Sequence, residues 1–186
     1  MLTAALTGAL LGFARGGRVN RIGHAGFRRW PLLVAGVGLQ VAASALPDAA
    51  GTVAIVTSFV ILVGFALSNL RFVGMAVVTV GMAMNTATIV TNGGMPVRED
   101  AVVAANIAEP GELAGVDLGP KRHLADDSDR LMVLSDIIPV SFTREVLSFG
   151  DLVVSLGVAD VVYHLLRRRP ASTVPAPVED AAVLGS

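Results

Sequence analysis

Long apolar blocks separated by short polar segments run through most of the chain. A helix needs about 20 mostly apolar residues to cross the ~30 Å hydrocarbon core of a bilayer, and several blocks approach that length without an ionised side chain. We therefore predict an all-α fold, an integral membrane helical bundle formed by residues 1–169. The blocks predict five transmembrane helices, over residues 2–14, 30–46, 51–69, 73–91 and 151–166.

The first block is the shortest of the five. At about 1.5 Å per residue, a helix over residues 2–14 would be only ~20 Å long. This is less than the thickness of the hydrocarbon core, so the segment is either a short span or one that its flanks extend. The sequence leaves open whether it crosses the membrane completely.

Residues 92–147 have a different character. They contain ten of the 15 acidic residues and four of the nine prolines, which predicts one long extracytoplasmic loop before the last span. Residues 96–108 predict a short helix within this loop, with a proline and acids in its first turn. Residues 170–186 are rich in proline, alanine and valine without periodicity, and we expect a disordered cytoplasmic tail.

The distribution of basic residues predicts how the spans are oriented. With the amino terminus outside, residues 15–29, Arg71 and residues 167–169 place nine basic side chains in the cytoplasm. Short cytoplasmic loops of multi-pass membrane proteins carry an excess of lysine and arginine. We therefore predict a plasma (cell) membrane protein with its amino terminus outside and its carboxyl terminus in the cytoplasm.

Composition narrows the classes of partner and chemistry. Only 16% of the residues are charged, against about 25% in an average soluble domain. A net charge of −1 argues against a nucleic-acid surface, and the absence of cysteine excludes disulfides, zinc–thiolate sites and a cysteine nucleophile. We expect the lipid bilayer and other membrane protein subunits as partners, with no nucleic acid, no cofactor and no metal.

Four polar side chains stand out within the predicted spans. The amides of Gln40 and Asn85 need partners in hydrocarbon, so we expect both to face the bundle, where they bond between helices or contact a ligand. Asp160 is ionisable at lipid depth and must be protonated, paired or exposed to a polar cavity. His164 lies one turn later, which predicts an Asp160–His164 hydrogen bond. The alternative is a proton or ion relay.

Asp136 and Asp151 form a second notable pair. Both lie near the predicted outer interface, separated by a segment that contains a proline. Two carboxyl groups a few Å apart can share a proton and activate water, which makes this pair a candidate aspartyl dyad. In the alternative interpretation, Ser148 and Asp151 form a capping box, and Asp151 only holds the start of the last helix.

The outer loop is long enough to form a lid or a docking surface. Its candidate anion contacts are Lys121, Arg122 and His123. The Asp-Asp-Ser-Asp sequence at residues 126–129 lacks the spacing and terminal glutamate of a calcium loop, so we expect a solvated acidic turn there.

Three short motifs lie at the end of the fourth predicted span, within the outer loop and at the start of the last span. They are Asn92-Gly93-Gly94-Met95-Pro96-Val97, Ser135-Asp136-Ile137-Ile138-Pro139 and Ser148-Phe149-Gly150-Asp151. Together with the short first span, they resemble an uncharacterised bacterial membrane family, domain of unknown function 5317, over roughly residues 1–168. The resemblance implies a multi-pass membrane protein and supplies no activity.

The start of the last span also resembles, more weakly, that of lipoprotein signal peptidases, which are helical membrane aspartyl proteases. Phe149-Gly150-Asp151 is similar to their Phe-Asn-x-x-Asp motif. Those proteases carry another catalytic aspartate where an inner helix closes, and residues 92–97 of this chain contain none.

These observations favour a non-enzymatic function, as a scaffold, an accessory subunit or a small binding protein that uses the outer loop. One alternative is a membrane-embedded aspartyl hydrolase that uses Asp136 and Asp151. The other is a proton- or ion-coupled transporter that uses Asp160.

Overall fold

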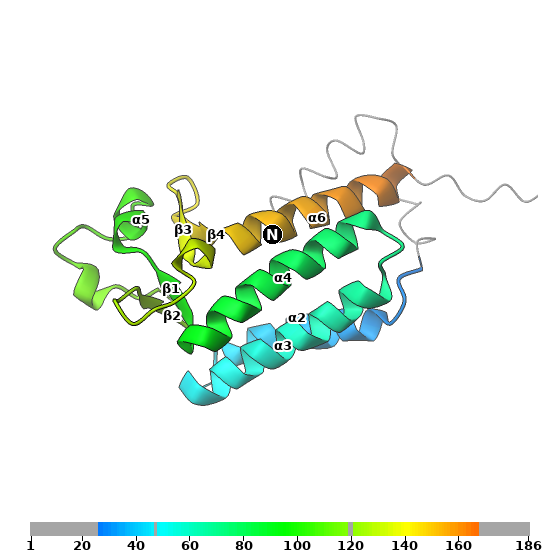
Figure 1. The fold of residues 1–186 in the computed structure, drawn as a ribbon, viewed down its shortest axis with the longest axis horizontal. Coiled ribbons are helices and arrows are strands. Elements are labelled where there is room, and N and C mark those ends of the chain that lie inside the picture. Colours follow the sequence, from blue (N-terminus) through cyan, green and yellow to red (C-terminus); the bar gives the residue numbers. More distant parts are fainter. Residues whose placement is uncertain (1–25, 47, 119–120, 168–186) are drawn as a thin grey trace, which may run out of the picture.

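Four long helices lie side by side and carry a small sheet at one end (Figure 1). The computed structural model describes residues 26–46, 48–118 and 121–167, so the predicted first span and tail lie outside the described residues. The elements are α2 (Trp30–Ala43), α3 (Asp48–Ser68), α4 (Val73–Asn92), β1 (Met95–Val97), α5 (Glu99–Ala104), η2 (Leu113–Gly115), β2 (Arg122–Leu124), η3 (Met132–Leu134), β3 (Asp136–Val140), β4 (Glu145–Ser148) and α6 (Phe149–Arg167).

Three of these helices, α3, α4 and α6, are long and apolar enough to cross a membrane, which suggests a membrane location. The bounds of these helices agree with three of the predicted spans to within a few residues. The span expected over residues 30–46 is shorter, because α2 ends at Ala43 and its 14 residues rise only ~21 Å. The next residues leave the helix in a tight turn in which the Ser44 hydroxyl donates to Val41 O. Among the described residues, three of the five expected spans are thus present as helices that could cross a membrane.

Glycines bring the backbones of α4 and α6 into contact. A Cβ atom added at Gly157 would lie 2.6 Å from Gly74 O, and one added at Gly81 would lie 2.7 Å from Gly150 O. Side chains of any size would force the helices apart at these points. Two glycines on each helix therefore set how α6 lies along α4.

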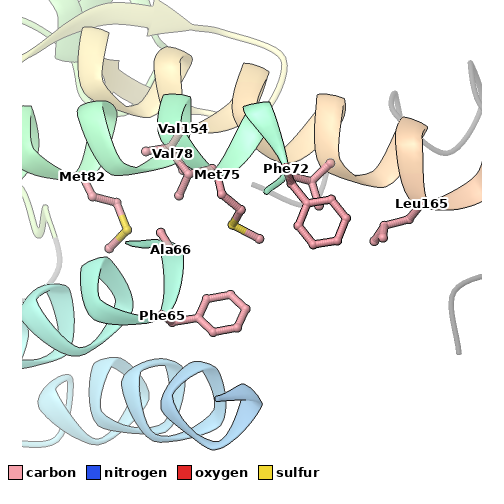
Figure 2. Packing of buried hydrophobic residues seen from close by; sticks show 9 residues of the cluster. Phe65, Ala66, Phe72, Met75, Val78, Met82, Val154 and Leu165 are labelled. Carbon is pink, nitrogen blue, oxygen red and sulfur yellow. The ribbon is translucent and has the colours of Figure 1, made fainter. Parts of the chain in front are cut away.

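The main core lies between α3, α4 and α6 (Figure 2). Met75 and Met82 of α4 point toward α3, which carries Phe65 and Ala66. Where lipid surrounds the helices, such packing stabilises them through van der Waals contact, because lipid chains are as apolar as the core itself. The buried members are Phe65, Ala66, Phe72, Met75, Val78, Met82, Val154, Val161 and Leu165.

The chain is mostly helical, but a four-stranded sheet occupies the region expected to be a loop. The strand order is β2-β1-β3-β4, with β1 parallel to both neighbours and β3 antiparallel to β4. The all-α prediction misses this sheet because its strands are only three to five residues long. The short helix expected over residues 96–108 is present as α5, with the two acids in its first turn, but it covers only Glu99–Ala104.

The sheet positions loop residues against the ends of α4 and α6. A register shift in the β3–β4 pair leaves Asp136 opposite Ser148, the residue that precedes α6. Strand β1 follows α4 after a turn at Gly93, which adopts a positive φ of 70°. The carboxyl end of α4, the amino end of α6 and the middle of the sheet therefore meet at one junction.

Candidate functional site

A hydrogen-bond network joins α4 to the start of α6 at this junction. The Ser148 N–H donates to Asp151 Oδ2 (3.1 Å) and the Asp151 N–H donates to Ser148 Oγ (2.9 Å), which confirms the predicted capping box. Asn85 donates from Nδ2 to Asp151 Oδ1 (2.8 Å) and accepts from Ser148 Oγ (2.9 Å). Asn85 is buried and bonds between helices, as the sequence predicts for this amide.

Asp136 is buried beside this network and is incompletely satisfied. Its side chain is 1% exposed, and Arg122 Nε lies 3.0 Å from Oδ2 as an ion pair. The contact is electrostatic and not well directed, since neither carboxyl oxygen accepts a hydrogen bond from a described residue. Burial raises the pKa of Asp136 to about 7. The Arg122 charge opposes this rise in the pKa, and the nearby Asp151 adds to it.

Asp136 and Asp151 line one cavity of about 240 Å³, here called the junction pocket. The structure therefore brings together the two carboxyl groups that the sequence suggested as a pair. Two cations also line this cavity, Arg122 at the start of β2 and Lys121 just before it. The other lining residues are Gln40, Ile55, Phe59, Asn85, Ile89 and Met95.

A larger apolar cavity of about 560 Å³, here called the helical groove, is lined by α2, α3, α4 and α6. Along α6 it reaches from Asp151 to Leu165, which is ~21 Å at 1.5 Å per residue. The helical groove and the junction pocket have four lining residues in common. They are Gln40, Phe59, Asn85 and Asp151. These side chains border both cavities, so the apolar groove and the charged pocket are adjacent.

Asp160 and His164 lie at the opposite end of α6 from the junction pocket. His164 Nδ1 lies 3.1 Å from Asp160 Oδ1, as the predicted pairing requires. In addition, the Gly74 N–H in the first turn of α4 donates to Asp160 Oδ2 (3.0 Å). A carboxyl group at a helix amino terminus is favourable, so these contacts give Asp160 a structural role. The transport hypothesis stays a prediction.

The candidate anion contacts of the outer loop separate into two sets. Lys121 and Arg122 line the junction pocket, whereas His123 turns to Asp129, with Nε2 and Oδ1 3.0 Å apart. Within the acidic turn, the backbone N–H and the hydroxyl of Ser128 both donate to Asp126 Oδ1. These two hydrogen bonds lower the pKa of Asp126. Within the described ranges, no three acidic or histidine side chains form a metal-binding group.

Two features of the site carry no signal in the sequence. Phe59 lines both the helical groove and the junction pocket. In the sequence, however, an aromatic residue in an apolar span looks the same whether it packs in a core or lines a cavity. The donor that Asp160 finds on Gly74 is a backbone group, which every residue except proline possesses.

Residues 26–163 match the model of a family described as "Family of unknown function (DUF5317)". The chain belongs to DUF5317. This match confirms the family that the three motifs resemble, and the DUF5317 region includes every residue of the junction pocket. No curated protein and no solved structure matches the chain.

Proposed function

We propose that this DUF5317 protein is a multi-pass membrane protein that binds one amphiphile, a molecule with an apolar chain and a polar head. The chain would occupy the helical groove and the head would occupy the junction pocket. Among the non-enzymatic functions that the sequence favours, this is the small binding protein. An accessory subunit that carries a bound lipid would use the same site.

The observation that supports this proposal is the shared wall of the two cavities. Gln40, Phe59, Asn85 and Asp151 line both, so an apolar space lined by four helices adjoins a pocket with charges of both signs. Ligand sites are mostly apolar with a few convergent polar groups. The ~21 Å length exceeds half of a ~30 Å hydrocarbon core, which is the depth of one lipid chain.

The proposal includes the topology that the arginines predict, with the sheet outside and the carboxyl terminus in the cytoplasm. The natural chain has no cysteine, so a single introduced cysteine reports its own location. Ser141 is exposed between β3 and β4. In intact cells, Ser141→Cys should react with a membrane-impermeant maleimide, and protection of this cysteine from the reagent would contradict the topology.

The binding proposal is tested by the lipid content of the purified chain. After extensive detergent exchange, mass spectrometry of an organic extract should find about one amphiphile per chain. Val158→Trp fills the helical groove and should abolish binding of the amphiphile. Leu156→Trp is the matched control, because Leu156 lies on the same helix and is 68% exposed outside both cavities. A wild-type chain without amphiphile would contradict the proposal.

A second candidate function is hydrolysis of a carbonyl bond in the bound amphiphile. It is favoured by the meeting of Asp136 and Asp151 in one pocket and by the raised pKa of Asp136. Water would attack the carbonyl carbon and pass a proton to Asp151. The protonated form of Asp136 would give its proton to the leaving oxygen or nitrogen as that bond breaks.

Hydrolysis would be detected in ¹⁸O-labelled water with ester- and amide-linked amphiphiles as substrates. The product acid should gain ¹⁸O with the wild-type chain and not with Asp136→Asn, while both bind the amphiphile. Absence of ¹⁸O incorporation by the wild type would restrict the function to binding.

A further inference from the structure

The charges of the junction pocket restrict the chemistry of the head that it can hold. Lys121 and Arg122 are neighbours in sequence, and both line the pocket. The end of the Lys121 side chain lies against the backbone of α3 at Gly51, where an added Cβ would lie 2.1 Å from Nζ. Among the side chains that the structure describes, no acidic group pairs with Lys121. Its ammonium is therefore available to an anion.

Arg122 supplies a second cation. Its Nε lies 3.0 Å from Asp136 Oδ2, an ion pair that keeps the guanidinium beside the buried carboxyl group. The side chain is 39% exposed, and a guanidinium has further N–H groups beyond Nε with which it can bind a phosphate in two-pronged fashion. An ammonium and a guanidinium that line one pocket suit a phosphate better than they suit a neutral head.

The two carboxyl groups of the pocket differ in what they can still accept. Asp151 already accepts from Asn85 and from the Ser148 N–H. Asp136 is 99% buried and its Oδ1 has no hydrogen-bond partner among the described residues. An unsatisfied buried acceptor is unfavourable, so a donor that enters the pocket and bonds to it is favoured.

We propose that the head bound in the junction pocket is a small phosphodiester that also carries a hydrogen-bond donor, an ammonium or a hydroxyl. Lys121 and Arg122 bind the phosphate, and Asp136 accepts from the donor. This inference rests on the proposed amphiphile binding and names the ligand class. A volume of about 240 Å³ suits a head of this size and excludes an oligosaccharide.

Four lipids with identical acyl chains separate the requirements. Phosphatidylethanolamine has a phosphate and an ammonium, and phosphatidylglycerol has a phosphate and hydroxyls. Phosphatidylcholine has a phosphate without a donor, and diacylglycerol has a hydroxyl without a phosphate. In competition for the purified wild-type chain, the first two should bind about tenfold more tightly than the last two. Phosphatidylcholine or diacylglycerol binding as tightly as phosphatidylethanolamine would overturn the inference.

Two variants assign the preference to residues. Lys121→Gln should reduce the affinity for the three phospholipids about tenfold and leave diacylglycerol unchanged. Arg144→Gln is the matched control, because Arg144 is exposed in the β3–β4 turn away from the pocket. In Asp136→Leu, the affinities for phosphatidylethanolamine and phosphatidylglycerol should fall to the affinity for phosphatidylcholine. If Asp136→Leu does not fold, the wild-type lipid series decides alone.

The outcome also distinguishes this inference from the proposed function. Equal, saturable binding of all four lipids would leave amphiphile binding intact and remove the head-group assignment. Binding of none of them in a saturable way would contradict both.

Discussion

The side-chain amide of Asn85 donates to the carboxylate of Asp151 at 2.8 Å, across the interface between α4 and α6. Both residues line the helical groove and the junction pocket. The bond therefore does two things at once. It holds the first turn of α6 against the end of α4, and it places a polar group at the point where the apolar cavity becomes charged.

Asn85→Leu should destabilise the bundle. Leucine has a similar size but neither donates to Asp151 nor accepts from Ser148, so two buried polar groups lose a partner. We expect a loss of about 1–3 kcal/mol in the free energy of unfolding in detergent micelles, followed by circular dichroism. Thr91→Val is the control, since its hydroxyl bonds only to its own helix in an exposed position, and it should change stability by less than about 0.5 kcal/mol.

The raised pKa of Asp136 predicts a pH dependence of stability. The folded pKa of about 7 exceeds the ordinary aspartate pKa of 3.8, so the folded state binds this proton more tightly than the unfolded state does. The contribution of Asp136 to stability should be complete below pH ~4, fall as the pH rises to ~7, and stay constant above. Arg122 and Asp151 face this carboxyl group and are unchanged in Asp136→Asn.

The measurement is the difference in unfolding free energy between wild type and Asp136→Asn from pH 4 to pH 8. The wild type should lose stability relative to the variant as the pH rises through this window. A difference that does not vary with pH would show that Asp136 titrates near its ordinary value.

Asp160→Ala should weaken the start of α4. It removes the acceptor of the Gly74 N–H, and loss of a helix cap costs about 0.5–2 kcal/mol. Asp160→Asn keeps a side-chain oxygen and should cost less. His164→Ala leaves the Gly74 contact in place and serves as the control in thermal unfolding. Unchanged stability of Asp160→Ala would remove the capping role.

Gly157→Ala should separate α4 from α6. The new Cβ would lie 2.6 Å from Gly74 O, and a backbone atom cannot yield as a side chain can. We expect a loss of about 1–3 kcal/mol from overpacking. Gly64→Ala is matched to it, because nothing lies within 4 Å of the new methyl group, and it should leave stability unchanged or slightly raise it. Equal melting temperatures would contradict the close packing.

The sequence predicts the long helices well, because each is a single apolar block with a turn at both ends. The start of α6 is a good example. Ser148 and Asp151 have the spacing of a capping box, a local pattern, and the structure has both of its hydrogen bonds. The end of α2 is harder to predict, since the apolar character continues through Leu46 after the helix has stopped.

Contacts between distant segments are not readable in the same way. The sheet pairs β1 with β2 and β3 in parallel, and three-residue strands leave no alternation to detect. The meeting of Asp136 with Asp151 was predictable only as a possibility of the intervening loop. It follows in fact from the β3–β4 register, which places Asp136 opposite Ser148. The junction pocket depends on this register, so it cannot be predicted from the sequence alone.

The most direct test of the central claim is saturation binding of a pyrene-labelled lysophospholipid to the purified chain at constant detergent concentration. The account predicts saturation at about one lipid per chain, loss of saturable binding in Val158→Trp, and wild-type binding in Leu156→Trp. A signal that rises without saturation, or a Val158→Trp variant that binds like the wild type, would contradict an amphiphile in the helical groove.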